Sequence, residues 1–207
     1  MSVNETDAGP LVPLHPEQVV GDALEMRWVV PAEVLTFVGG TQQVPAGLQA
    51  LLDDGTITSV TVDSASVRTR LAPGLSWRSE GARVRTALQG ALAVPEEWAP
   101  LRSSSPDDVL QAAVHEVIAG EVGDFVRSHG GEISLVGVRD GVVTVSMNGA
   151  CAHCPASRVT LGDRFETALR SRFPALRVVQ RVDASTSTLA AGGRRRLPLL
   201  VSRIRRG

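Results

Sequence analysis

The sequence predicts an α+β fold with two small domains, and three observations support this prediction. Runs of alternating apolar residues, typical of strands, occur in both halves of the chain. Segments with apolar residues at helical spacing lie between these runs. A stretch rich in Pro and Ser, residues 94–106, separates the halves and has the composition of a linker. At 207 residues the chain is long enough for two modest hydrophobic cores.

The first domain is predicted over residues 24–93 with the order ββαββα. One or two short extended segments fall between Trp28 and Phe37. A short helix follows over 45–55, because Pro opens this segment and Gly closes it. Two runs of alternating β-branched residues flank Asp63-Ser64 and predict a hairpin, and residues 75–93 predict a second helix. Residues 1–23, acidic and Pro-rich, are predicted to be a flexible N-terminus.

The second domain is predicted over residues 107–182 with the order αββαβ. Ser105, Pro106 and Asp108 have the pattern of a helix start with a capping box. Apolar spacing continues this helix to Phe125, although two internal glycines weaken it. The dipeptide Asp140-Gly141 joins two alternating runs, which predicts a hairpin.

A helix and a strand are predicted to complete this domain after the hairpin. The helix extends to about Phe173, where Pro174 ends it. Residues 176–182 have the pattern of a last strand, so the segment around residues 149–155 becomes a strand-to-helix corner. After the domain comes an Arg-rich tail, residues 183–207.

Charge is balanced overall but unevenly distributed. The net charge is −1, yet residues 1–26 carry five acids and no base, and residues 183–207 carry six Arg and one Asp. The balance argues against nucleic acid or an anionic membrane as a partner. The tail predicts either a solubilising end or a segment that binds back to the acidic N-terminus. No secretory signal or membrane span is apparent, so we expect a cytoplasmic protein.

The chemistry of the sequence centres on two residues, Cys151 and Cys154, which are the only cysteines. They lie at the predicted strand-to-helix corner, where helix N–H groups and the helix dipole favour thiolate. A tetrahedral thiolate site for zinc or an iron–sulfur cluster usually requires four ligands, and one chain supplies two. Either other residue types complete the site, or a second copy of the chain in a two-fold dimer does.

The stretch "VVTVSMNGACAHCPASRVTLGDRFETALRSRFPALRVV" closely resembles the C-terminal domain of NifU-like (Nfu-type) iron–sulfur cluster assembly proteins. The resemblance covers about residues 107–182, and its core is Gly149-x-Cys151-x-x-Cys154-Pro155 followed by Ser157. Residues 24–93 resemble a diverged Nfu N-terminal domain more weakly. The resemblance implies that Cys151 and Cys154 ligate a [4Fe–4S] cluster, with [2Fe–2S] as the other option, usually between two protomers.

The resemblance therefore implies a non-enzymatic scaffold or carrier that passes a cluster to apoproteins. Its expected partners are a second copy of the chain, apo iron–sulfur recipients and upstream cluster-assembly machinery. Two alternatives remain open. The first is a thiol–disulfide oxidoreductase with Cys151 as nucleophile and Cys154 as the resolving thiol. The second is a dimeric zinc-binding protein with the same four sulfurs.

Overall fold

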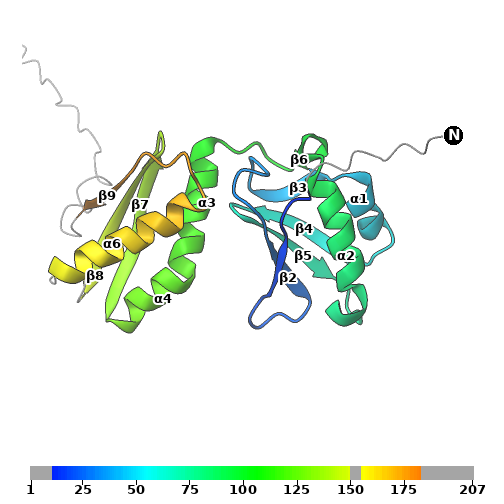
Figure 1. Ribbon diagram of the computed structural model, residues 1–207, viewed down its shortest axis with the longest axis horizontal. Helices are drawn as coiled ribbons and strands as arrows, with labels where there is room; N and C mark the ends of the chain where they lie inside the picture. The colour runs from blue at the N-terminus through cyan, green and yellow to red at the C-terminus, as the bar shows by residue number, and fades with distance from the viewer. Residues whose placement is uncertain (1–10, 150–154, 183–207) are drawn as a thin grey trace, which may run out of the picture.

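The computed structural model describes residues 11–149 and 155–182 and contains two β-sheets with helices, which confirms the α+β class. The larger sheet and its helices use residues 11–105, here the first unit. The smaller sheet and its helices use residues 106–182, here the second unit (Figure 1). Each sheet is part of its own buried hydrophobic cluster, and the two clusters share no residue. The domain boundaries predicted from the sequence stay a prediction.

The first unit is a six-stranded antiparallel sheet with the order β1-β2-β5-β4-β3-β6. Its elements are β1 (His15–Gln18), β2 (Glu25–Val29), β3 (Gly39–Gln43), α1 (Ala46–Asp53), β4 (Ile57–Asp63), β5 (Ser66–Leu71), α2 (Trp77–Leu92), the 3-10 turn Pro95–Glu97 and β6 (Ala99–Pro100). The predicted hairpin is present as β4 and β5, with Val62 opposite Val67.

The two faces of the first sheet differ because side chains alternate along each strand. One face buries Trp28, Val67 and Leu71 against α1 and α2, which contribute Leu48 and Leu88 to the same cluster. The Trp28 indole N–H donates to the Thr69 hydroxyl at 2.8 Å, so its buried polar atom is satisfied. The opposite face carries a set of charged side chains on neighbouring strands.

Two features of the first unit differ from the prediction. Residues 1–23 were predicted to be a flexible N-terminus, but His15–Gln18 form β1 and pair with β2. Residues 94–106 were predicted to be a linker, but β6 pairs with β3 inside this segment. Both are edge strands, and all four residues of β1 are exposed, so neither leaves the apolar alternation that signals a strand. Pro100 is tolerated because an edge strand can lack a backbone donor.

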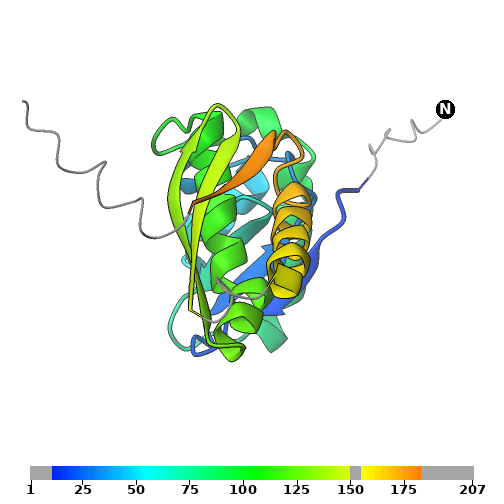
Figure 2. The same ribbon diagram turned by 90° about the vertical axis from the view of Figure 1, so that its left-hand side faces the viewer.

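The second unit is a three-stranded sheet with the order β7-β8-β9, in which β7 is antiparallel and β9 parallel to the central β8. Its elements are α3 (Pro106–Ala119), α4 (Glu121–Ser128), β7 (Gly131–Arg139), β8 (Val142–Gly149), α6 (Pro155–Arg170) and β9 (Val178–Val182). The helices α3, α4 and α6 lie on the same side of this sheet (Figures 1 and 2). Leu110, Val126, Val145 and Phe165 meet in the buried cluster between them.

The single helix predicted at the start of the second unit is in fact two helices, α3 and α4, so the αββαβ prediction was wrong at this point. The break lies at Gly120, whose backbone is extended (φ −95, ψ −159). Gly123 fits tightly after the break, because a Cβ there would lie 1.8 Å from the Ile118 carbonyl oxygen. The predicted capping box is present at the other end of α3, with Ser105 and Asp108 bonded reciprocally.

The predicted hairpin at Asp140-Gly141 is also present, and both residues have positive φ. The Asp107 carboxylate accepts hydrogen bonds from the backbone N–H of Asp140 at 2.9 Å and of Gly141 at 3.1 Å. The first turn of α3 therefore fixes the β7–β8 turn. This contact holds one end of the sheet, and β8 runs from it toward the cysteine segment at the other end.

Candidate functional site

Cys151 and Cys154 lie outside the described residues, but the elements on both sides of them are described. The strand β8 ends at Gly149, and the helix α6 begins at Pro155. This agrees with the strand and helix predicted to flank the cysteine pair. The central strand β8 pairs with β9 as far as Ser146 and with β7 as far as Gly149, so β7 holds the strand up to the last described residue before the cysteines.

Gly149 is the last described residue before the cysteine segment, and its conformation requires glycine. Its φ is +74°, and a Cβ at this position would lie 2.3 Å from the Gly130 carbonyl oxygen. Gly149 also pairs with Gly131 in the β7–β8 register. The start of the cysteine segment is therefore packed closely against the turn between α4 and β7.

That turn contains His129, which ends α4 and is exposed. Its Nδ1 lies 2.8 Å from the Phe125 carbonyl oxygen, and its ring centroid lies 4.3 Å from that of Phe125. His115 of α3 is also exposed. Through Gly130 and Gly131, His129 belongs to the turn that supports Gly149.

No group of three or more His, Cys, Asp and Glu side chains that could hold a metal ion occurs in residues 11–149 and 155–182. The cysteine pair stays the donor set predicted from the sequence, and its soft sulfurs would suit an iron–sulfur cluster or zinc. The described part of the chain also contains no helix long and apolar enough to cross a membrane.

Three carboxyl groups have a lowered pKa, and the causes are structural. A hydrogen bond from the Arg70 side chain lowers the pKa of Asp22, and one from the Ser105 side chain lowers that of Asp108. Hydrogen bonds from Thr56, followed by Arg83, lower the pKa of Asp54 to about 2. These groups belong to the first unit and to the cap of α3, so none of them is a candidate acid or base beside Gly149.

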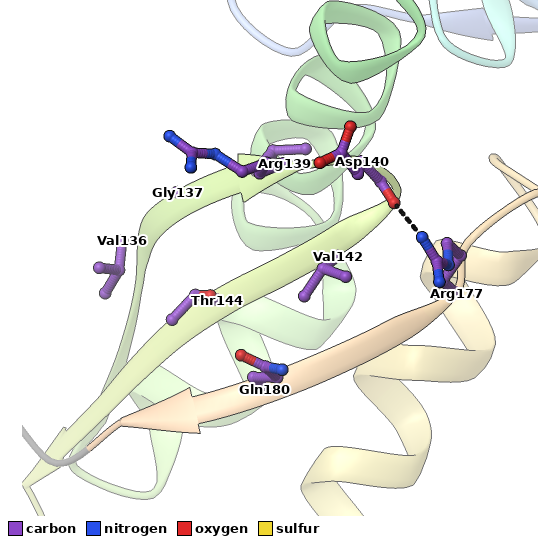
Figure 3. Close-up of a pocket in the computed structure, with 9 residues that line it drawn as sticks. Val136, Gly137, Arg139, Asp140, Val142, Thr144, Arg177 and Gln180 are labelled. Carbon is purple, nitrogen blue, oxygen red and sulfur yellow. Dashed lines mark hydrogen bonds between the residues drawn. The ribbon is translucent and has the colours of Figure 1, made fainter.

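A hollow of about 550 Å³ lies on the exposed face of the second sheet (Figure 3). Its lining includes Arg139, Asp140, Thr144 and Gln180. Arg177 lies at its edge and donates to the Asp140 carbonyl oxygen at 3.4 Å. The hollow is at the hairpin end of β8, away from the Gly149 end, so it is separate from the candidate cysteine site.

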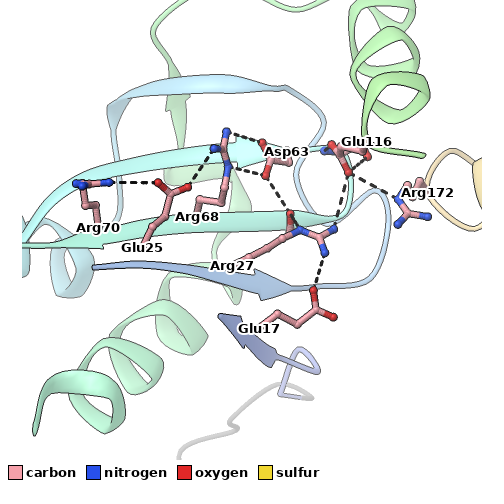
Figure 4. Close-up of polar contacts among 10 residues, drawn as sticks. Glu17, Glu25, Arg27, Asp63, Arg68, Arg70, Glu116 and Arg172 are labelled. Carbon is pink, nitrogen blue, oxygen red and sulfur yellow. Dashed lines mark hydrogen bonds and ion pairs between the residues drawn. The ribbon is translucent and has the colours of Figure 1, made fainter. Parts of the chain in front are cut away.

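A network of ion pairs covers the charged face of the first sheet and reaches the second unit (Figure 4). Within the sheet, Arg68 pairs with Asp63 at 2.9 Å and with Glu25 at 3.1 Å. These charges neutralise one another on neighbouring strands. The face is therefore a set of satisfied pairs and offers little free charge to a ligand.

Glu116 of α3 connects this face to the second unit. Its carboxylate accepts hydrogen bonds from the Ser64 backbone N–H at 2.8 Å and hydroxyl at 2.9 Å, in the β4–β5 turn. It also forms ion pairs with Arg27 at 4.0 Å and with Arg172, just after α6, at 3.7 Å. Sequence reasoning missed this contact, because residues 52 positions apart carry no local signal of pairing.

Comparison with known proteins finds a family match in the second unit. A NifU-like domain matches residues 114–180, from α3 to β9, and spans the cysteine segment. The second unit therefore contains a NifU-like domain. The match extends into the first unit in the Fe/S biogenesis protein NfuA of Shewanella amazonensis, which is 29% identical over 180 residues, 84% of this chain and 89% of that protein.

Two eukaryotic relatives match a shorter segment. NifU-like protein 1, chloroplastic, of Arabidopsis thaliana is 30% identical over 43% of this chain, and the match spans 41% of that protein. The human NFU1 iron-sulfur cluster scaffold homolog, mitochondrial, is 29% identical over 38% of this chain, and the match spans 31% of that protein. The chain thus aligns with less than half of the length of these two relatives.

Proposed function

We propose that this protein is an iron–sulfur cluster scaffold or carrier that holds a cluster as cargo through Cys151 and Cys154. One observation carries the proposal: the NifU-like match over residues 114–180 contains the only two cysteines of the chain. The names of the relatives, an Fe/S biogenesis protein and an iron-sulfur cluster scaffold homolog, agree with this role. No bond-forming active site is needed, so the protein is not proposed to be an enzyme.

The number of thiolates supports a cluster shared by two copies of the chain. A [4Fe–4S] cluster has four iron sites that each take one protein ligand, and one chain supplies two sulfurs. A two-fold homodimer supplies four from a symmetric arrangement. We therefore propose a [4Fe–4S] cluster between two protomers, with a [2Fe–2S] cluster held by the same sulfurs as the alternative.

Release of the cargo is favoured by the small number of bonds to each protomer. Each protomer holds the cluster through only two bonds, so the incoming thiolates of a recipient replace them one at a time. Loosening the dimer removes half of the ligands and favours transfer. The N-terminus of α6, which follows Cys154 directly, stabilises the free thiolates between steps. The expected partners are apo iron–sulfur proteins and upstream assembly machinery in the cytoplasm.

The proposal is tested by cluster transfer. The protein is reconstituted anaerobically with iron and sulfide, separated from free iron, and mixed with an apo-ferredoxin, whose own spectrum reports loading. We expect transfer from the wild type and none from Cys151→Ser or Cys154→Ser. Protein that binds zinc in preference to iron, or that stays colourless while reducing insulin disulfides, would support the zinc or the oxidoreductase alternative instead.

A further inference from the structure

The helices α4 and α6 of the second unit line a groove that the proposed function does not use. Its volume is about 530 Å³. Apolar parts of Val122, Phe125 and Ala168 line it, and the exposed acids Glu121 and Asp163 stand at its rim. The Arg164 guanidinium lies over the Phe125 ring, 4.8 Å from its centroid. The groove thus combines an apolar lining with two acids and one Arg, so these three charges leave a net charge of −1.

The two rim acids are available to a ligand. Neither the Glu121 nor the Asp163 carboxylate forms a hydrogen bond or ion pair with any residue in the described part of the chain. This differs from Asp124 and Glu166 on the same helices, which pair with Arg127 and Arg170. An adjoining hollow of about 360 Å³ shares Glu121, Val122 and Ala168, so the groove continues toward Arg27 of the first unit.

The chain carries a segment with the complementary composition. Residues 194–206 read "RRRLPLLVSRIRR", in which Arg clusters flank a run of apolar residues. The acids at the rim of the groove match the Arg clusters at the two ends of this segment, and the apolar lining of the groove matches its apolar middle. Like charges repel, so the Arg clusters of this segment do not suit a positively charged binding site. The acids at the rim of the groove likewise do not suit a nucleic acid as its occupant.

The segment is also close enough to reach the groove. The strand β9 ends at Val182, and Arg181 lies across α6 at Gly162, where a Cβ would be 1.2 Å from its Nη2. Gly162 directly precedes Asp163 in α6. Residues 183–193, "DASTSTLAAGG", are mainly small and polar, which is the composition of a linker. Such a linker has a root-mean-square length of about 18 Å, which exceeds the roughly 10–12 Å diameter of a helix.

We propose that residues 194–206 bind in the groove between α4 and α6, with their Arg side chains at Glu121 and Asp163. The bound tail would cover the part of α6 that faces α4. The groove and the tail are independent of the cluster, so the inference stands or fails separately from the proposed function.

Limited trypsin digestion of the full-length protein tests this inference, because trypsin cleaves after the Arg residues of the tail. A tethered segment at an effective concentration of about 1 mM with an intrinsic Kd of about 0.1 mM is bound about ten-elevenths of the time. We therefore expect cleavage at Arg194–196, measured by mass spectrometry, to be about tenfold slower in the wild type than in Glu121→Gln/Asp163→Asn. Added salt should remove this difference.

The matched control is Glu80→Gln/Glu96→Gln, which changes the net charge equally but affects acids of the first unit, outside the groove. It should keep the wild-type protection. Equal tail cleavage in the wild type and the groove variant would overturn the proposal. Protection that rises with protein concentration would also overturn it, because the occupant would then be the tail of a second copy. As a second readout, Arg194→Gln/Arg195→Gln/Arg196→Gln should shift the NMR amide signals of Val122 and Ala168 while leaving those of the first sheet unchanged.

Discussion

Substitution of Gly149 by Ala tests whether the entry to the cysteine segment depends on a close backbone contact. The φ of +74° places Gly149 in the left-handed region, which costs an L-residue with a side chain about 1–2 kcal/mol. The new Cβ would lie 2.3 Å from the Gly130 carbonyl oxygen, and the forced backbone shift adds about 1–3 kcal/mol. The expected loss of stability of the second unit is therefore about 2–5 kcal/mol.

Gly55→Ala is a matched control for this substitution. Its φ is +73°, nearly the same, but a Cβ there meets nothing within 4 Å. Its expected cost is the conformational part alone, about 1–2 kcal/mol. The difference between the two variants isolates the contact with Gly130.

Urea denaturation can follow the two units separately. All three tryptophans, at positions 28, 77 and 98, belong to the first unit, so fluorescence reports that unit, whereas far-UV circular dichroism reports both. With an m-value of about 1.5 kcal/mol per M, Gly149→Ala should lower the midpoint of the second unit by more than 1 M and leave the fluorescence midpoint nearly unchanged. Gly55→Ala should lower the fluorescence midpoint by less than Gly149→Ala lowers the midpoint of the second unit. If Gly149→Ala costs no more than Gly55→Ala, the steric reasoning is refuted.

Three further predictions concern the elements that hold the units. Glu116→Ala should remove about 2–4 kcal/mol of stability, because it leaves the buried Ser64 N–H without its charged acceptor. Fluorescence and circular dichroism should then show that the unfolding transitions of the two units lie further apart. Unchanged transitions would contradict this prediction. Ser105→Ala should cost the second unit about 1 kcal/mol through loss of the α3 cap, read from its urea midpoint, and a change below about 0.3 kcal/mol would argue against the cap. Thr56 lowers the pKa of Asp54 to about 2, whereas Asp in an unfolded chain titrates near pH 3.9, so the stabilising effect of Asp54 should be present above about pH 4 and disappear as pH falls toward 2. Asp54→Asn should therefore be less stable than the wild type at pH 7 and equal to it near pH 2. A difference in stability that persists at pH 2 would refute the assignment.

The parts of the fold that could be predicted from the sequence are those with local signals. The Asp140-Gly141 turn and the Ser105 cap are specified by residues adjacent in the chain, and both are confirmed. The edge strands β1 and β6 were missed because their pairing depends on partner strands and not on their own pattern. The break at Gly120 was underestimated, since apolar spacing continues across it.

The candidate site shows the same division. The flanking strand and helix could be predicted, because periodicity and Pro155 mark them. The contact of Gly149 with Gly130 and the contact of Glu116 with Ser64 could not, because they join residues distant in sequence. The ligand role of Cys151 and Cys154 stays a prediction, since both lie outside the described residues.

Native mass spectrometry of the anaerobically reconstituted protein tests whether two chains share one cluster. We predict a species of two chains that carries one [4Fe–4S] cluster and that is absent from both Cys151→Ser and Cys154→Ser. Mixing wild type with either variant should give no stable heterodimer with a complete cluster, because only three sulfurs remain. A cluster bound stoichiometrically to a single chain, or retained by the variants, would contradict the sharing of four sulfurs between two identical protomers.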